Sequence, residues 1–371
     1  MIRNFKRTAS ILGVVAAGSA ALVACGDSAT DGASSSNGES SAAEGDLSGT
    51  SGELVAEGAS SQQNAMEIFG TTYAESVDGA SLAYNPTGSG SGRTNFVAGQ
   101  VDFAGSDSPL SEDQVAPATE RCGGNEAWHL PFVIGPVAIA YNLDGVEKVN
   151  LSVPTLIKIF KGEITNWNDE AIAAENEGTE LPDQGITVVY RSDESGTSQN
   201  FQKFLATAGE WDGEGQQFPN AIGEGANGSN GVATQVKNVP GAITYVEYGF
   251  ALQNDLGIAA VDFGSGATEL NAENVNVALE GLEFKNEGHN MVVDTEALFS
   301  QTQEGAYPLV LTTYEIVCSA GYDEDVQNRL KDFLTVALNN QDALAEIGFI
   351  PVEGSHRDRL VEAVAAIGEG A

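Results

Sequence analysis

An α/β protein with two domains is predicted by three features of this 371-residue sequence. Short apolar runs that suit strands alternate with segments of helical periodicity, which is typical of α/β architecture. About 325 residues follow a polar N-terminal segment, which is enough chain for two domains. Several strand-like runs also lead into small hydroxyl-rich loops that open helices. Such loops lie where open α/β sheets bind their ligands.

The first 24 residues are predicted to be an export signal. Arg3, Lys6 and Arg7 precede an apolar stretch, residues 11–23, that is short for a membrane span. The stretch ends in Leu22-Val23-Ala24-Cys25, which resembles a bacterial lipobox. We therefore expect a mature chain that begins at a lipidated Cys25 and is held at the membrane by at least two acyl chains, palmitate among them. An ordinary signal peptide with an incidental cysteine is the alternative.

Residues 25–46 are predicted to form a disordered tether. After the cysteine they consist almost entirely of Gly, Ser, Ala, Thr, Asp, Glu and Asn, and such a composition cannot bury enough apolar surface to offset its chain entropy. A flexible linker of this length has a root-mean-square reach of roughly 25 Å. The folded part would therefore stand away from the membrane.

The charge balance excludes some partners. The chain has 16 Lys and Arg against 53 Asp and Glu, a net charge of −37. This argues against nucleic acid and against anionic lipid as direct partners. It does not exclude a small anion as ligand, because surface charge is screened over about 8–10 Å whereas oriented donors act at contact distance.

The octet Arg191-Ser192-Asp193-Glu194-Ser195-Gly196-Thr197-Ser198 is the most informative loop. It follows the apolar run 186–190 and precedes a helical pattern at 199–205. The loop offers a guanidinium group, hydroxyls and backbone N–H groups, and a helix N-terminus adds a partial positive charge that suits an anion. Taken alone, an N-capping serine with solvated neighbours would explain the loop equally well.

Two further loops have the same character. Gly58-Ala59-Ser60-Ser61 follows the strand-like run 53–56 and opens a helical pattern at 62–69. Thr87-Gly88-Ser89-Gly90-Ser91-Gly92 follows residues 82–84 and opens the segment 93–98. If the three loops converge, they form a cage of donors for one small oxyanion.

A fourth segment, Val101-Asp102-Phe103-Ala104-Gly105-Ser106-Asp107-Ser108-Pro109-Leu110, makes a family resemblance clear. Together with residues 132–137, 159–167 and 240–248, these loops make the chain from about Gly52 onward similar to periplasmic-type phosphate-binding proteins, the substrate-binding components of phosphate ABC importers. The resemblance implies a two-lobed α/β clamshell of type II-like class with two hinge crossovers. It also implies high-affinity binding of inorganic phosphate between the lobes and its delivery to a membrane permease and ATPase.

The resemblance also implies a set of binding residues. In the family, phosphate is held by the first loop, the glycine-rich loop, the aspartate of the Gly-Ser-Asp segment and the arginine loop. These correspond here to Ser60, Ser61, Ser89, Asp107, Arg191, Ser195, Gly196 and Thr197, with Asp193 orienting the arginine. Ser60 stands where many members have threonine, Ser61 where many have an aromatic residue, and Pro86 where a glycine is common. None of these departures removes a donor.

The implied lobe I takes residues 47–131 and 309–371, and lobe II takes residues 132–308, with hinge strands near 130–133 and 308–312. The segment 325–339 carries apolar residues at helical spacing and is predicted to be a helix facing a core. Once Cys25 is assigned to lipidation, Cys122 and Cys318 are left in an exported chain, so a disulfide between them is expected. Spacing alone does not establish that bond.

An enzyme would be a different kind of protein, and the sequence does not favour it. The three histidines, His129, His289 and His356, show no metal-ligand spacing, and neither a G-x-S-x-G elbow nor a phosphate-binding G-x4-G-K-[ST] loop occurs. Ser195 has no evident base partner. We therefore expect neither catalysis nor a metal or cofactor, and a phosphate-ester hydrolase is an unfavoured alternative.

Two further functions stay compatible with these residues. A binding protein for sulfate or molybdate would share the donors, but a buried Asp107 carboxylate can only accept, and phosphate near neutral pH has a proton to give whereas sulfate has none. Asp107 could instead merely cap the next helix. A surface antigen or sensor without a transport partner is the second such function. We expect a monomer at the extracytoplasmic face of a bacterial cell membrane.

Overall fold

A computed structural model describes residues 46–219 and 222–369. The predicted signal peptide, Cys25 and nearly all of the tether lie outside these residues. Within the described part, no helix is both long and apolar enough to cross a bilayer.

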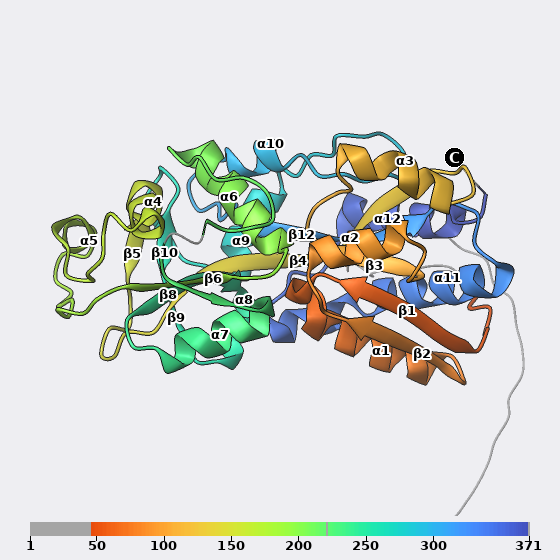
Figure 1. The fold of residues 1–371 in the computed structure, drawn as a ribbon, viewed down its shortest axis with the longest axis horizontal. Coiled ribbons are helices and arrows are strands. Elements are labelled where there is room, and N and C mark those ends of the chain that lie inside the picture. Colours follow the sequence, from red (N-terminus) through yellow and green to blue (C-terminus); the bar gives the residue numbers. More distant parts are fainter. Residues whose placement is uncertain (1–45, 220–221, 370–371) are drawn as a thin grey trace, which may run out of the picture. The chain divides into compact units, whose positions relative to one another are not determined.

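Most strands belong to one mixed sheet with the order β2-β1-β3-β12-β4-β8-β6-β7, and β9 pairs with β4 (Figure 1). Its strands are β1 (Gly52–Gly58), β2 (Ala80–Asn85), β3 (Phe103–Ser106), β4 (Ala127–Tyr141), β6 (Thr187–Arg191), β7 (Glu224–Ala226), β8 (Ala242–Glu247), β9 (Gly257–Ile258) and β12 (Val310–Cys318). A second sheet contains β5 (Asn150–Ser152), β10 (Ala260–Asp262) and β11 (Ala267–Thr268).

The large sheet holds two parallel groups. Strand β1 pairs parallel with β2 and with β3, and β6 pairs parallel with β7 and with β8. The antiparallel strands β12 and β4 lie between the groups. Since carboxyl ends of parallel strands meet at one edge, each group gathers the loops that follow its own strands.

Strand β4 connects the two groups. All of its fifteen residues are buried. Its residues 127–136 pair with β12, and residues 137–141 pair with β8. The register shifts at Thr313/Tyr314 of β12, opposite the predicted hinge residues 130–133. The lobe boundaries themselves remain a prediction.

Helices flank these strands (Figure 1). They are α1 (Gln63–Ser76), α2 (Ser89–Val97), α3 (Glu112–Arg121), α4 (Val153–Lys161), α5 (Glu170–Glu175), α6 (Gly196–Ala208), α7 (Gly228–Asn238), α8 (Tyr248–Gln253), α9 (Ala272–Leu279), α10 (Thr295–Phe299), α11 (Glu324–Asn339) and α12 (Gly354–Ala366), with 3-10 turns at Ser60–Gln62 and Gln341–Ile347.

The predicted helix 325–339 is confirmed as α11. Its Leu330, Phe333 and Leu334 are fully buried. The Phe333 ring stacks on Phe103 of β3 with centroids 5.4 Å apart and meets Tyr73 of α1 edge-on at 5.6 Å. Aromatic pairs of this kind add about 0.5–1.5 kcal/mol beyond their area burial. They fix α1 and α11 against the strand that leads into Asp107.

The predicted strand–loop–helix units are also confirmed, but their helices begin earlier than predicted. The first turn of helical structure begins at Ser60, α2 at Ser89 and α6 at Gly196. Serine and glycine are poor interior helix formers. The first helical N–H groups have no intrahelical acceptor, so these residues are well suited to the first turn. The donor loops are thus themselves helix N-termini.

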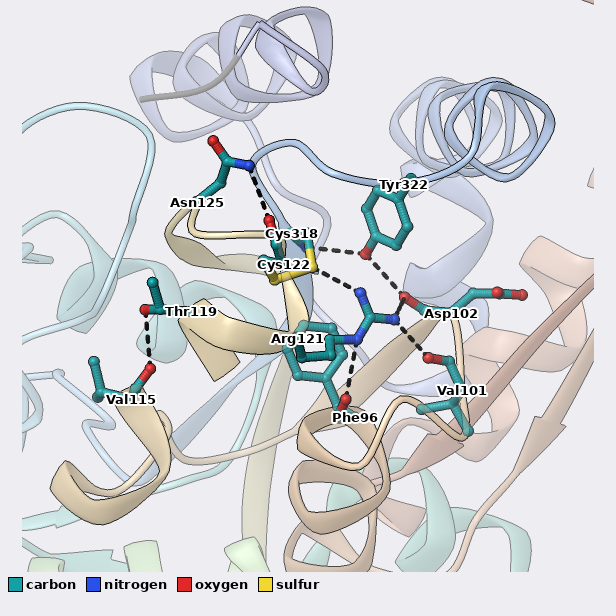
Figure 2. The surroundings of a disulfide bond; sticks show 10 residues. All are labelled: Phe96, Val101, Asp102, Val115, Thr119, Arg121, Cys122, Asn125, Cys318 and Tyr322. Carbon is teal, nitrogen blue, oxygen red and sulfur yellow. Dashed lines mark hydrogen bonds between the residues drawn. A yellow bond between two sulfur atoms is a disulfide. The ribbon is translucent and has the colours of Figure 1, made fainter. Parts of the chain in front are cut away.

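The predicted disulfide between Cys122 and Cys318 is confirmed, with Cα atoms 5.3 Å apart. It joins the residue after α3 to the last residue of β12. Figure 2 shows the Arg121 side chain beside it, with its N–H groups directed at backbone carbonyls of Phe96, Val101 and Asp102. The disulfide and these Arg121 hydrogen bonds together fix the loop that enters β3.

Candidate functional site

The predicted binding residues lie at the carboxyl edges of the two parallel groups. Strands β1, β2 and β3 lead into the loops with Ser60 and Ser61, with Ser89, and with Asp107, while β6 leads into Arg191 and the loop that opens α6. Every one of these side chains is buried, with at most 4% of its surface exposed. The structure therefore brings the four predicted segments into one buried site.

Hydroxyl groups fix the Asp107 carboxylate. Ser61 Oγ donates to Oδ1 at 2.6 Å, and Thr313 Oγ1 of β12 donates to the same oxygen at 2.7 Å. Ser89 Oγ lies 3.3 Å from Oδ2 and accepts from the Asp107 N–H at 3.1 Å. Oxygen Oδ1 has two strong donors, whereas Oδ2 has one long contact. Oδ2 is therefore the oxygen with capacity to accept from a ligand.

Burial raises the pKa of Asp107, and the hydroxyls of Ser61, Thr313 and Ser89, together with the charge of Arg191, oppose that rise. A carboxylate in this setting gains from each further donor that meets it. The interpretation of Asp107 as merely a helix cap is wrong, because α3 begins at Glu112 and is capped by Ser111, whose side chain forms a capping box with Gln114.

A second cluster centres on Arg191. Its Nε donates to Asp193 Oδ1 at 2.8 Å, and its Nη2 pairs with Asp193 Oδ2, so the two planar groups meet in a bidentate ion pair. Burial acts to raise the pKa of Asp193, but the hydrogen bonds and charge of Arg191 outweigh it and hold the pKa below its ordinary value. Asp193 thus has the geometry expected of the residue that orients the arginine.

The remaining Arg191 donors face hydroxyl groups. Nη1 lies 3.3 Å from Thr197 Oγ1 and 3.2 Å from Ser229 Oγ at the start of α7. Ser229 connects this cluster to the first loop, since its N–H donates to Ser60 Oγ at 3.0 Å and the two hydroxyl oxygens lie 3.2 Å apart.

The N-terminus of α6 connects the Asp107 cluster with the Arg191 cluster. A Cβ atom on Gly196 would lie 2.4 Å from Ser89 Oγ and 2.6 Å from Asp107 Cβ, so a larger residue cannot take this place. Asn200 of the same helix donates to the Asp107 carbonyl at 2.6 Å. The guanidinium group and the carboxylate of Asp107 therefore share one site.

Ser195 is the N-cap of α6, as its simpler interpretation predicted. Its Oγ accepts from the Ser198 N–H at 3.1 Å, which leaves the hydroxyl proton to donate elsewhere. The N–H groups of Gly196 and Thr197 occupy the first turn, where no intrahelical acceptor exists. These groups, together with Arg191, form a concentrated set of donors for an anion.

Three residues of this site were missed by the sequence prediction: Ser229, Glu247 and Thr313. Ser229 lies in Asn227-Gly228-Ser229, a fourth small hydroxyl-rich loop before a helix, so the same pattern could have found it. Glu247 ends the apolar strand β8 and accepts from Thr197 Oγ1 at 2.6 Å. Thr313 lies within a buried strand, and no local signal distinguishes it.

Metal ligation has no support in the described residues, which contain no group of three or more His, Cys, Asp and Glu side chains placed to hold an ion. The arrangement is instead one of fixed hydrogen-bond donors around one arginine, with carboxylates as acceptors. This chemistry suits a small oxyanion that carries a proton.

Comparisons with known proteins agree. A family model described as a PBP superfamily domain matches residues 40–341. Phosphate-binding protein PstS2 of Mycobacterium bovis BCG is 41% identical over 372 residues, which cover 98% of this chain and 100% of the relative. The chain belongs to the PstS family of phosphate-binding proteins. PstS 3 of Mycobacterium tuberculosis H37Rv is likewise 41% identical over 371 residues, with the same coverage of both chains.

The fold has solved counterparts among the phosphate-binding proteins. A high-affinity periplasmic phosphate-binding protein with bound phosphate superposes with a TM-score of 0.67 at 23% identity, over 83% of this chain and 92% of that chain. A phosphate ABC transporter substrate-binding protein from Clostridium perfringens gives a TM-score of 0.58 at 18% identity, over 81% and 100%. The predicted fold class, a two-lobed α/β clamshell, is confirmed.

Proposed function

We propose that this chain binds inorganic phosphate at the buried site between Arg191 and Asp107 and delivers it to a membrane ABC permease. The observation that carries the proposal is the pairing of an arginine, held by Asp193, with a carboxylate whose Oδ2 has the capacity to accept a further hydrogen bond. The 41% identity to PstS proteins over nearly the whole chain supports the same ligand.

The proposed ligands are the predicted set, Ser60, Ser61, Ser89, Asp107, Arg191, Ser195, Gly196 and Thr197. Arg191 supplies charge-assisted hydrogen bonds, and the first turn of α6 supplies backbone N–H groups and the positive end of a helix dipole. The Ser61 hydroxyl donates to Asp107, so the Ser61 backbone N–H is the donor we assign to phosphate. Ser229 is an added candidate, because its Oγ already faces Nη1 of Arg191.

Asp107 is proposed to make the site selective for a protonated anion. Phosphate can donate its O–H to Oδ2, whereas sulfate would place a bare oxyanion against a buried carboxylate. Sites built to pair a ligand O–H reject the analogue that lacks it by about 10⁴–10⁵. We expect strong phosphate binding and negligible sulfate binding near neutral pH.

Paired calorimetric titrations of both anions into wild type and Asp107→Asn test this selectivity. The amide has no charge and can donate, so sulfate affinity should rise by more than phosphate affinity falls. Asp183→Asn, which changes a carboxylate that hydrogen-bonds Asn166 outside the site, is the matched control and should alter neither affinity. Undetectable sulfate binding together with intact phosphate binding in Asp107→Asn would assign the selectivity to other residues.

We propose that the protein is not an enzyme. A hydrolase would need a base beside Ser195, and the histidines have other contacts: His129 Nε2 accepts from the Leu110 N–H, and His356 Nε2 lies 2.9 Å from the Pro131 carbonyl oxygen. Incubation of purified protein with a phosphate ester should release no phosphate above the blank. Turnover that persists through purification and is lost in Ser195→Ala would overturn this proposal.

We propose that lobe I (47–131 and 309–371) closes on lobe II (132–308) about β4 and β12 when phosphate binds. The reverse movement releases phosphate for delivery. The paired strands offer a bending point at the register shift between Thr313 and Tyr314. Small-angle scattering with and without phosphate should show a smaller radius of gyration in the bound protein. Identical scattering at saturating phosphate would contradict the closure.

We propose that a lipidated Cys25 anchors a monomer at the extracytoplasmic face of the membrane. The lipobox-like Leu22-Val23-Ala24-Cys25 supports this proposal. Cys25→Ser should release processed protein or leave unprocessed precursor, as followed by detergent partitioning. Processed mutant protein that still enters the detergent phase would contradict the proposed lipid anchor. If the protein were instead a surface antigen without a transporter, deletion of its gene would leave phosphate uptake by the cell unchanged.

A further inference from the structure

A second carboxylate, Glu247, lies among the proposed phosphate ligands. It is the last residue of β8, at the same edge as Arg191, and only 1% of it is exposed. Its Oε1 accepts from Thr197 Oγ1 at 2.6 Å, and its Oε2 has no hydrogen-bond partner. An unpartnered oxygen on a buried carboxylate is costly, whereas an unpartnered carbonyl oxygen of a neutral carboxyl group costs less.

This contact has a consequence for Thr197. A hydroxyl group has one proton and two acceptor positions. Here Oγ1 faces Arg191 Nη1, which can only donate, and Glu247 Oε1, which can only accept as long as the carboxyl group is ionised. The hydroxyl proton is therefore directed to Glu247, and Thr197 cannot donate that proton to an anion in the same state.

The charged groups that face Glu247 are Arg191 of β6 and Asp107 after β3. Burial raises the pKa of Glu247, the charge of Arg191 opposes that rise, and the charge of Asp107 adds to it. The hydroxyls of Thr197 and Ser229 act to lower it. Arg191 already neutralises Asp193 in the ion pair, so a further anion in the site adds negative charge that Arg191 alone does not balance.

We propose that Glu247 takes up one proton from solvent when phosphate binds, and that this reverses the hydrogen bond to Thr197. With the proton on Oε1, Glu247 donates to Thr197 Oγ1, and the threonine hydroxyl turns its own proton toward the anion. No covalent bond to phosphate forms or breaks. Glu247 is thus a positioning residue that acts through Thr197, and the inference rests on the proposed phosphate-binding function.

The first test is calorimetry of inorganic phosphate binding in two buffers of different ionisation enthalpy, which counts the protons taken up per phosphate. The pH is held above the second pKa of phosphate, so that protonation of the ligand contributes equally to every variant. Wild type should take up about one proton more than Glu247→Gln. Equal uptake in two proteins that both bind phosphate overturns the inference.

Glu315→Gln is the matched control. Glu315 is also fully buried, receives a hydrogen bond from Gln62 and has one unpartnered oxygen, but it forms no hydrogen bond with Arg191 or Thr197. Burial raises its pKa well above the ordinary value, and its hydrogen bond comes from Gln62, outside the proposed ligands, so phosphate binding should not change its protonation. Its variant should keep the wild-type uptake. Loss of uptake in Glu315→Gln with retention in Glu247→Gln would assign the proton to Glu315 and overturn the inference.

Infrared difference spectroscopy gives a second measurement that needs no stable Gln variant. Phosphate should produce the carbonyl stretch of a newly protonated carboxyl group in wild type, and that band should shift in Glu247→Asp. Saturating phosphate without such a band overturns the inference. Wild type that binds no phosphate in either method contradicts the proposed function instead, so the two failures are distinct.

A double-mutant cycle tests the route through Thr197. If Glu247 acts by turning the threonine hydroxyl, the loss of phosphate affinity in Glu247→Gln should largely disappear in a Thr197→Val background. Fully additive losses would show that Glu247 does not act through Thr197 and would overturn that half of the inference.

Discussion

Two arginines of this chain, the partly buried Arg121 and the buried Arg191, are used in opposite ways. Arg121 donates to the backbone carbonyls of Phe96, Val101 and Asp102, and its guanidinium lies over the rings of Phe96 and Tyr322 at 4.4 and 5.1 Å (Figure 2). Arg191 donates instead to the Asp193 carboxylate and to the hydroxyls of Thr197 and Ser229.

The difference lies in what the acceptors can do. A backbone carbonyl cannot move away without disturbing the chain around it, so the Arg121 contacts last as long as the fold. A hydroxyl group rotates at little cost, so Thr197 and Ser229 can yield Nη1 to an anion. Asp193 meanwhile keeps the guanidinium plane in place. A side chain with partners that cannot move, such as Arg121, thus marks a structural region. A side chain with partners that can be exchanged, such as Arg191, marks a binding region.

Removing the disulfide beside Arg121 should have the largest effect on stability. Cys122→Ala with Cys318→Ala opens a link between residues 196 positions apart, and loss of such a bond costs about 2–4 kcal/mol. Chemical denaturation should show this loss in the free energy of unfolding, while calorimetry should show unchanged phosphate affinity. Non-reduced peptide mapping of wild type is the control. Two free thiols there, or a large fall in affinity in the variant, would contradict the separation of the two regions.

Arg191→Lys should have the largest effect on binding. Lysine keeps the charge but loses the fork that meets Asp193 and the hydroxyls together. Charge-assisted hydrogen bonds contribute about 1.5–3 kcal/mol each, so phosphate affinity should fall on the order of 100-fold at fixed salt. Unfolding by denaturant measures the accompanying change in the free energy of unfolding, which should be smaller than the change in the free energy of phosphate binding. Wild-type affinity in this variant would remove Arg191 from the site.

Arg121→Lys is the matched opposite experiment. The same substitution now removes donors to carbonyls and the stacking between Phe96 and Tyr322, so the free energy of unfolding should fall by about 1–2 kcal/mol. Phosphate affinity should stay within about twofold of wild type, because the lost hydrogen bonds run to Phe96, Val101 and Asp102 and to none of the proposed ligands. An affinity loss equal to that of Arg191→Lys would show that the Arg121 contacts position the binding site and do not only stabilise the fold.

The sequence predicted those parts of the molecule that depend on local pattern. Residue types at fixed spacing identified the strand–loop–helix units, α11 and the residues of the Arg191 loop. The cysteine pair followed from elimination. The exact helix starts were missed because serine and glycine have low helix propensity, a preference that does not apply in the first turn.

The partners of the two carboxylates could not be predicted in the same way. Thr313 meets Asp107 across 206 positions of sequence, and Glu247 meets Thr197 across 50. Such contacts follow from the strand order, which places β12 beside β3 and β8 beside β6. Thr313 stands in no distinctive local motif, and Glu247 lies in the segment 240–248, which contributed to the family resemblance without indicating a role for this residue. Ser229 differs from them, because its loop repeats the pattern already recognised three times.

The last expected effect concerns His129, which lies between the two regions, and it is small near neutral pH and grows as the pH falls. It is paired with Ile316 of β12, and its Nε2 accepts from the N–H of Leu110, at the end of the segment that carries Asp107. Its Nδ1 lies 2.8 Å from Asn290 Oδ1. Burial lowers the pKa of His129 to about 4, because the charged imidazolium is poorly solvated and the neighbouring Arg93 also disfavours it, against the opposing hydrogen bond to Asn290.

A histidine with a lowered pKa makes stability depend on pH in a defined direction. Between pH 6.5 and about 4 the unfolded chain binds a proton at His129 that the folded protein does not, so the free energy of unfolding should fall as the pH falls, by at most about 1.4 kcal/mol per pH unit. His129→Gln keeps an acceptor for Leu110 and cannot titrate, so the wild-type minus variant difference isolates this contribution from the buried carboxyl groups. Urea unfolding at several pH values measures it. A difference independent of pH would show that His129 titrates with the same pKa in the folded and unfolded chains, and its Nε2 would then lose, on protonation, the Leu110 hydrogen bond that joins the disulfide region to the Asp107 segment.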